Sequence, residues 1–308
     1  MSGRSPAEIW EDVLEEGERR LGRGSGALVA TGLLGGVDVM FGVLALVVST
    51  AALSTVMPAQ TAHVLGSLTF GLALVFLTVG RSELFTENFL IPVSSVYAGR
   101  NTIWALLRLW SITLAANLVG LLLMALVFSP HGVLEPATLK AAGKVGEAYT
   151  SRGVVAALLS AVAAGALMTL FTWFASAAES DVTRLFLGLI AGFLLVAPSL
   201  NHAVVSFGEI VFGIIAGTSK SNVGDLLGNF GRPSSATSSA GSAWSRPRGW
   251  LRCAASRGPN RAGRRAGAAR AAQRAREATV LRTRGAAALR TRREGGLSRC
   301  CAARSRFR

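Results

Sequence analysis

Cysteine is nearly absent from this sequence, and charge is absent from long parts of it. The chain has 308 residues and only three cysteines, which all lie far along the chain: Cys253, Cys300 and Cys301. Residues 1–230 can therefore hold neither a disulfide nor a cysteine metal site. They also show no nucleophile–base pair and no metal-ligand cluster, so we expect no enzyme, no catalytic residue, no cofactor and no bound metal.

Five stretches of the chain are apolar and almost free of charge. Two of them contain no Asp, Glu, Lys or Arg, and each of the other three contains a single such residue, Asp38, Arg108 or Glu209. A helix needs roughly 20 apolar residues to span the hydrocarbon core of a bilayer. The sequence therefore predicts an all-α integral membrane protein, with five spans inside residues 28–57, 63–80, 102–128, 153–178 and 185–215.

Polar residues interrupt two of these spans. Residues 81–90, RSELFTENFL, follow the second apolar stretch directly, and apolar residues then continue to Val96. The fifth stretch is broken at residues 198–202, Pro-Ser-Leu-Asn-His, where proline removes a helix hydrogen bond. Polar backbone at membrane depth survives only inside protein or along a cavity. Channels and transporters build sites at the bilayer midplane from broken helices, so these two breaks predict transport.

The order of the spans predicts three segments. Residues 1–24 form an amphipathic, acidic N-terminal helix centred on residues 6–21, which is unlike a cleavable signal peptide. Residues 25–230 form a channel domain, in which the broken second and fifth helices predict an inverted repeat. Such a repeat needs a sixth span. We expect that only its start is present and that the rest of the sixth helix is missing.

Residues 231–308 differ sharply from the rest of the chain. They contain 20 arginines, no lysine and two acids, a net charge of +18, whereas residues 1–230 carry a net charge of −3. We expect this Arg-rich tail to be disordered. It begins where a sixth span is due, and its composition fits GC-rich codons read in a shifted frame. We therefore interpret it as a frameshift product, and we do not expect nucleic acid as a partner.

Two alternatives stay open at this stage. The chain could be a truncated membrane protein that transports nothing, because one wall of its pore is not encoded. It could instead be a membrane-tethered binder of nucleic acid or anionic lipid, since an arginine-rich arm suits both polyanions. Against the second alternative, five spans with a cytoplasmic N-terminus would place the basic tail outside, contrary to the positive-inside tendency.

Several short motifs resemble the formate/nitrite transporter family. Leu84-Phe85-Thr86, in the first break, is similar to the family's loop signature, and His202, in the second break, is similar to its central histidine. A subgroup of uncharacterised inner-membrane members shares further motifs with this chain, at residues 84–88, 108–110, 117–120 and 202–209. The resemblance covers residues 8–230.

The resemblance implies an aquaporin-like fold, a homopentamer and one pore in each protomer. It places the chain in the inner membrane of the cell, as a multi-pass protein with a cytoplasmic N-terminus that contacts the lipid bilayer. The implied permeants are small monovalent anions of weak acids, such as formate and nitrite, together with protons. The function it predicts is a channel or a proton-coupled transporter for these anions.

The resemblance also assigns a substrate pathway, residue by residue. Phe70 and Leu74 match the first apolar constriction, and Leu195 matches the aromatic residue of the second. Thr86 matches the loop threonine and His202 the central histidine, while Asn201 stands where formate channels carry glutamate. The asparagine of the family's sixth span has no counterpart in this reading.

Thr86 belongs to a polar loop that we interpret as the mobile gate. The other residues of this gating loop are Glu83, Leu84, Phe85, Glu87 and Asn88. His202 then acts as a proton donor or a polariser, since a neutral acid crosses an apolar ring at far lower cost than its anion.

Simpler readings of the same residues are open as well. His202 could be a structural histidine bonded to a neighbouring carbonyl group, and Thr86 could cap the helix that follows it. Asp38 and Glu209 are expected to pair with Arg81 or Arg108 and so lock helices together. Arg81, Glu83 and Glu87 could instead line a solvated rim: residues of this type are usually hydrated.

Overall fold

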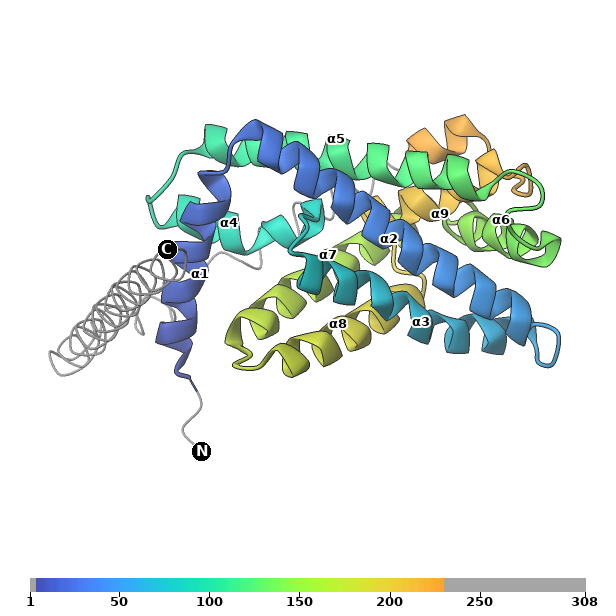
Figure 1. The fold of residues 1–308 in the computed structure, drawn as a ribbon, viewed down its shortest axis with the longest axis horizontal. Helices are drawn as coiled ribbons and strands as arrows, with labels where there is room; N and C mark the ends of the chain where they lie inside the picture. The colour runs from blue at the N-terminus through green and yellow to red at the C-terminus, as the bar shows by residue number, and fades with distance from the viewer. Residues whose placement is uncertain (1–3, 230–308) are drawn as a thin grey trace, which may run out of the picture. The chain divides into compact units, whose positions relative to one another are not determined.

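A computed structural model of the chain describes residues 4–229 (Figure 1). The described residues form α-helices and one short 3-10 helix, and no strand occurs among them. The all-α fold predicted from the apolar stretches is therefore confirmed. The expectations for residues 231–308, which concern disorder, a shifted frame and binding of polyanions, lie outside the described residues.

The predicted N-terminal helix is present as α1 (Pro6–Leu21). The Ser5 hydroxyl accepts a hydrogen bond from the Glu8 backbone N–H, and the Glu8 side chain accepts one from the Ser5 backbone, which forms a capping box. At the other end, Arg108 donates to the carbonyl oxygens of Leu21 at 2.9 Å and of Arg23 at 2.7 Å. The ends of α1 are therefore fixed, and the α1 end at Leu21 is tied to a membrane helix.

Four described helices are long and apolar enough to cross a membrane: α2 (Ser25–Leu53), α3 (Ala59–Gly80), α5 (Ile103–Phe128) and α7 (Val154–Ala177). The described fold also contains four shorter helices, the 3-10 helix and a helical segment at residues 223–229: η1 (Phe85–Phe89), α4 (Ile91–Tyr97), α6 (Pro136–Thr150), α8 (Asp181–Val196) and α9 (Ala203–Ile215). α2 packs against both α3 and α5, while α1 and α4 lie at one end of this group and α6 and α9 toward the other (Figure 1).

The first break differs from the prediction in its details. The span before it was expected inside residues 63–80, but α3 begins at Ala59 and runs for 22 residues. It ends because Arg81 adopts a left-handed conformation, with φ of 50°. The apolar residues that continue to Val96 do not resume one helix, because the chain forms η1 and then α4.

The second break agrees with the prediction. α8 and α9 have 16 and 13 residues, so each is shorter than a full span, and residues 197–202 separate them. Ser199 has φ of 51°, a left-handed conformation that costs a non-glycine residue of order 1 kcal/mol. Residues 223–229 then form the first turns of another helix, where a sixth span was expected to start.

The first halves of the two broken spans, α3 and α8, pack against each other. Glycines make this approach possible, since a Cβ at Gly192 would lie 2.6 Å from the Cα of Gly71. A Cβ at Gly71 would in turn lie 2.6 Å from the Cα of Leu189. Close contact through small residues is typical of membrane helices. This crossing supports the predicted inverted repeat, because it pairs corresponding elements of the two halves.

Replacing Gly192 by alanine is expected to destabilise the fold by about 1–3 kcal/mol, because the new methyl group forces α3 and α8 apart. Thermal unfolding of the protein in detergent measures the loss. Gly26→Ala in α2 is the matched control, since nothing lies within 4 Å of its added Cβ. An unfolding temperature for Gly192→Ala equal to that of Gly26→Ala would show that the crossing is not tight.

Candidate functional site

The six residues predicted to line a substrate pathway are all buried in the protomer. None has more than 1% of its surface exposed: Phe70, Leu74, Thr86, Leu195, Asn201 and His202. Three of them are apolar and lie on α3 and α8, while the other three lie in or beside the two breaks. The fold therefore separates an apolar part of the candidate site from a polar part.

The apolar part lies at the crossing of α3 and α8. The Phe70 ring packs beside Gly192, with its Cδ1 3.4 Å from where a Cβ would stand. Leu74, one turn further along α3, lies against Gly188 of α8. Leu195 lies one turn beyond Gly192 and joins the same buried cluster. Large apolar side chains thus fill the space that the glycines leave between the two helices.

Thr86 contributes a free hydroxyl group to the polar part. It lies inside η1, and the helix-capping positions there belong to Leu84 and Leu90, neither of which makes a side-chain cap. The Oγ1 atom of Thr86 is buried and has no hydrogen-bond partner among the described residues. The reading of Thr86 as a helix cap is therefore wrong. A buried hydroxyl without a partner costs about 1–3 kcal/mol, which favours a role outside folding.

His202 is a cap and also carries a free nitrogen. Its Nδ1 accepts a hydrogen bond from the Val205 backbone N–H at 3.2 Å, so His202 is the N-cap of α9. A nitrogen that accepts carries no proton, so in the neutral ring the proton is on Nε2. That Nε2 atom is buried and has no partner among the described residues. The expectation of a structural histidine is thus half right: Nδ1 fixes the ring, but no carbonyl group occupies Nε2.

Hydrogen bonds hold the second break around His202. Arg152 donates to the Ser199 carbonyl oxygen at 2.6 Å, and the Ser160 hydroxyl accepts from the Asn201 backbone N–H at 2.9 Å. The amide of Asn201 pairs reciprocally with that of Asn229, with distances of 3.0 and 3.2 Å. The position beside the histidine therefore carries a neutral amide, hydrogen-bonded through both its nitrogen and its oxygen, instead of a carboxylate.

Asn229 was missed by the sequence analysis, which found no asparagine of a sixth span at the site. It lies in residues 223–229, is 6% exposed and bonds directly to Asn201. Asn229 was not recognised because it lies directly before the Arg-rich tail. The sequence Leu-Leu-Gly-Asn at residues 226–229, which follows a polar turn, was the one signal that a further helix begins there.

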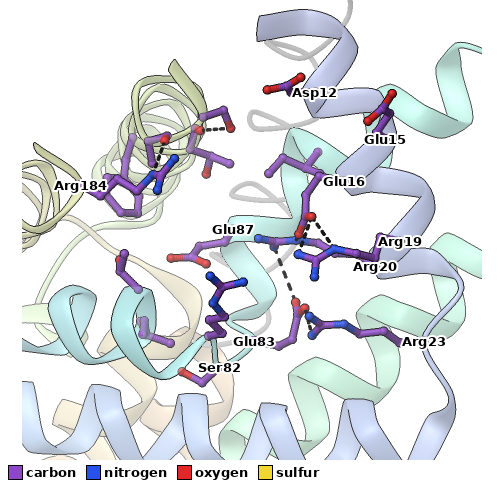
Figure 2. Close-up of a pocket in the computed structure, with 18 of the residues that line it drawn as sticks. Asp12, Glu15, Glu16, Arg19, Arg20, Arg23, Ser82, Glu83, Glu87 and Arg184 are labelled. Atoms are coloured by element: carbon purple, nitrogen blue, oxygen red, sulfur yellow. Dashed lines mark hydrogen bonds and ion pairs between the residues drawn. The ribbon is translucent and has the colours of Figure 1, made fainter. Parts of the chain in front are cut away.

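The gating loop is anchored instead of solvated. Glu83 is 2% exposed and bonds to Arg23 at 2.5 Å, with Arg20 at 3.7 Å (Figure 2). Asn88 donates to the other Glu83 oxygen at 3.1 Å, and Asn117 donates to the Glu83 carbonyl oxygen at 2.9 Å. The reading of Glu83 as part of a solvated rim is therefore wrong. Arg20 also donates to the Asn88 side-chain oxygen at 3.0 Å, so these bonds tie the loop to α1, to the residues just after it and to α5.

Leu84 and Phe85 complete the anchoring of the loop, and both are buried. The Phe85 N–H donates to the Asn117 side-chain oxygen at 2.9 Å, and the Phe85 ring meets Phe89 edge-on at 5.1 Å. Glu87 is partly exposed and faces a cavity instead.

The predicted ion pairs of Asp38 and Glu209 are wrong. Asp38 accepts a hydrogen bond from the Ser82 hydroxyl at 2.5 Å. Arg108 donates to the Leu21 carbonyl oxygen at the end of α1 and not to either acid. Glu209 is 1% exposed, and the side chains that act on it electrostatically are Tyr149 and Arg152. Neither carboxylate oxygen of Glu209 has a hydrogen-bond partner among the described residues, whereas Asp38 bonds to a residue that tertiary packing brings close.

Two cavities lie at opposite ends of α3. The first-break cavity, of about 730 Å³, is lined by residues from α1, from the first break and from the ends of α3, α7 and α8, including Arg81, Glu87 and Leu77 (Figure 2). The second-break cavity, of about 470 Å³, is lined by His63, Ser199 and residues of α2 and α6. Phe70 and Leu74 lie between His63 and Leu77 on α3 and line neither cavity. The two cavities are therefore separated along α3 by the apolar part of the site.

α1 forms one wall of the first-break cavity, and its charges are paired. Glu16 bonds to Arg19 and Arg20 (Figure 2). Burial raises the pKa of Glu16, but Arg20 and Arg19 outweigh this effect and hold the pKa below its ordinary value. The stabilisation from Glu16 is therefore present at neutral pH and is lost as the pH falls through that lowered pKa.

A helical membrane protein with two broken helices, a free polar atom at each break and a cavity at each end has the architecture of a channel or transporter. A sequence model of one such family, described as formate/nitrite transporter, matches residues 7–236. The chain therefore belongs to the formate/nitrite transporter family, and it is a membrane protein of the channel and transporter class.

Individual relatives agree with this assignment. The chain is 26% identical to the inner membrane protein YfdC of Escherichia coli K12, over 68% of this chain and 67% of that protein. It is 26% identical to the formate channel BtFdhC of Bacillus thuringiensis, over 68% of this chain and 79% of that protein. A solved structure titled as a pentameric formate channel with formate bound shares the fold, with a TM-score of 0.59, 16% identity and coverage of 71% and 94%.

Proposed function

We propose that this chain is a channel or proton-coupled transporter for small monovalent anions of weak acids, such as formate or nitrite. It works as a homopentamer in the inner membrane, with its N-terminus in the cytoplasm and its lipid-facing helices in the bilayer. The observation that carries the proposal is the pair of buried, unpartnered polar atoms, Thr86 Oγ1 and His202 Nε2, one at each break.

Both atoms suit a small anion. Nε2–H of His202 and the Thr86 hydroxyl are hydrogen-bond donors, and η1, which carries Thr86, packs against α9, which His202 caps. The N-terminus of α9 adds a partial positive charge close to His202. Hydrogen bonds from these donors replace part of the anion's hydration. They therefore lower the free energy cost of removing the anion from water before it meets Phe70 and Leu74.

The tautomer of His202 favours the role of polariser over that of proton donor. A charged imidazole carries a proton on Nδ1 as well, and it then cannot accept the Val205 N–H that caps α9. Protonation of His202 would therefore remove the side-chain cap of α9, at a cost of about 1 kcal/mol. A neutral ring keeps this bond and still donates from Nε2 to the anion.

Replacing Thr86 by valine is expected to lower anion flux about tenfold or more while raising stability by about 1 kcal/mol, because a buried hydroxyl without a partner is removed. Formate flux into liposomes and thermal unfolding in detergent measure the two effects. Thr113→Val is the matched control, since that buried hydroxyl donates to the Leu109 carbonyl oxygen at 2.6 Å. The control should lose stability and keep its flux. If Thr86→Val kept its flux while Thr113→Val lost it, Thr86 would not belong to the pathway.

The function itself is tested by reconstituting the full chain. The mass of the purified complex in detergent should be that of a pentamer, and liposomes that contain it should take up formate or nitrite faster than empty liposomes. A monomer, or uptake no faster than in empty liposomes for any small weak-acid anion, would instead support the non-transporting alternative.

A further inference from the structure

Glu209 is a buried acid that the pathway past Thr86 and His202 leaves unused. It lies on α9 and is 1% exposed. Among the described residues, neither of its carboxyl oxygens has a hydrogen-bond partner and no basic side chain forms an ion pair with it. Ionisable side chains at membrane depth are rare, are normally paired and mark ion or proton pathways. An acid without a partner therefore points to a ligand.

Glu209 lies on the same face of α9 as His202. Positions 202, 206 and 209 have the spacing i, i+4, i+7, which places three side chains along one face of a helix. Ser206 stands between the other two, and its hydroxyl donates to the His202 carbonyl oxygen at 2.8 Å. Ser206 and Glu209 are the polar side chains within α9, and both are buried. The polar face of α9 thus runs from the second break to Glu209.

Two groups outside α9 act on the carboxyl of Glu209, and they are Tyr149 of α6 and Arg152. α6 comes close because Gly146 has no side chain: a Cβ there would lie 2.8 Å from the Glu209 carbonyl oxygen. α5, α2 and η1 also pack against α9, but within the described residues none of their titratable side chains acts on Glu209.

Tyr149 connects the carboxyl with a less buried part of the chain. The Cζ atom of Arg152, which is partly exposed, lies 5.7 Å from the centroid of the Tyr149 ring. A phenol hydroxyl can donate and accept a hydrogen bond. Tyr149 therefore offers a proton route between Glu209 and the surroundings of Arg152.

We propose that Glu209 is a proton-binding site, and that proton binding there is coupled to anion binding at His202. The carboxylate takes up one proton from water and becomes a neutral carboxyl, which needs no cation as a partner. Seven helical residues separate it from His202, roughly 10 Å along the helix axis.

The coupling is electrostatic. A carboxylate at Glu209 and an anion at His202 repel each other, and at an effective dielectric constant of about 20 this repulsion changes an equilibrium about tenfold. A proton on Glu209 therefore favours the anion, and the anion favours the proton by the same factor. The coupling rests on the proposed function, whereas the proton site itself does not.

Glu209→Gln tests the coupling, because an amide has the shape of a protonated carboxyl and cannot ionise. Formate flux is measured in liposomes that contain the full chain, with equal pH on both sides and with uptake by empty liposomes subtracted. In the original chain, the KM for formate should rise about tenfold from acidic to alkaline pH. In Glu209→Gln, it should stay at the low value at every pH. A merely structural role would change flux by one factor at all pH values.

Two further variants complete the test. Glu209→Asp keeps an ionisable carboxyl, so it should keep the pH dependence of the KM. Glu135→Gln is the matched control, since Glu135 is exposed and makes no side-chain cap, and it should behave like the original chain. A KM that rises with pH in Glu209→Gln as it does in the original chain would overturn the coupling, as would a KM of the original chain that does not depend on pH.

Infrared spectroscopy of the detergent-solubilised chain separates the proton site from the proposed function. A protonated carboxyl has a carbonyl stretching band apart from those of carboxylates and amides. At neutral pH, the difference between the spectra of the original chain and of Glu209→Gln should contain this band. The band in a chain without any flux would support the proton site and contradict the proposed function. Absence of the band would overturn the proton site.

Discussion

Replacing His202 by asparagine is expected to lower formate flux at least a hundredfold without unfolding the protein. Asparagine is a good N-cap, so its side-chain oxygen can take over the bond from the Val205 N–H. It does not reproduce the Nε2–H group that points away from the cap. The loss of one preorganised donor in a buried polar site typically costs ~10²–10³ in rate.

His202→Ala separates the two roles of the residue. It removes the cap as well as the donor, so it should lose stability by about 1 kcal/mol relative to His202→Asn. Both variants should show the same low flux. Flux in His202→Asn close to that of the original chain would show that the imidazole does not contact the permeant, and that His202 only begins α9.

Replacing Glu83 by alanine is expected to destabilise the protein by about 3–5 kcal/mol, the range for breaking a buried ion pair. Glu83 is 2% exposed, and its removal leaves Arg23 without its ion-pair partner and takes one of two acceptors from Asn88, while Arg20 keeps Glu16. The loop that carries Thr86 then loses its ion pair with Arg23 and keeps only the bond from Arg20 to Asn88, at 3.0 Å, as its link to α1. Flux should fall together with the unfolding temperature, since Thr86 is no longer held in place.

Asp12→Ala is the control for this prediction. Asp12 also bonds to an arginine, Arg4, but its side chain is 59% exposed. Exposed ion pairs contribute no more than about 1 kcal/mol, so the control should unfold close to the original temperature. Equal unfolding temperatures for Glu83→Ala and Asp12→Ala would mean that the loop does not depend on its connection to α1.

The membrane helices could be predicted well because their signals are local. Long uncharged runs set the positions of α2, α5 and α7, and the span expected inside residues 102–128 is α5, Ile103–Phe128. The amphipathic pattern did the same for α1. The break after Val196 followed from a proline and two polar residues, which disrupt a helix wherever they occur.

Side-chain partners could not be predicted, because they depend on which helices cross. Asp38 bonds to Ser82 and not to an arginine, and Glu83 turned out to be the buried anchor of the loop. The free atoms of Thr86 and His202 were likewise invisible in the sequence, since freedom from a partner is a property of the fold. The three-segment division of the chain and the mobility of the gating loop stay predictions.

The most direct test of the central claim is a paired flux measurement. Liposomes that contain equal amounts of the full chain or of His202→Asn are given a formate gradient, and the entry of formate is followed over time. We predict rapid, saturable entry for the full chain and entry near that of empty liposomes for the variant. No entry with either protein, or equal entry with both, would contradict a weak-acid anion pathway that runs past Thr86 and His202.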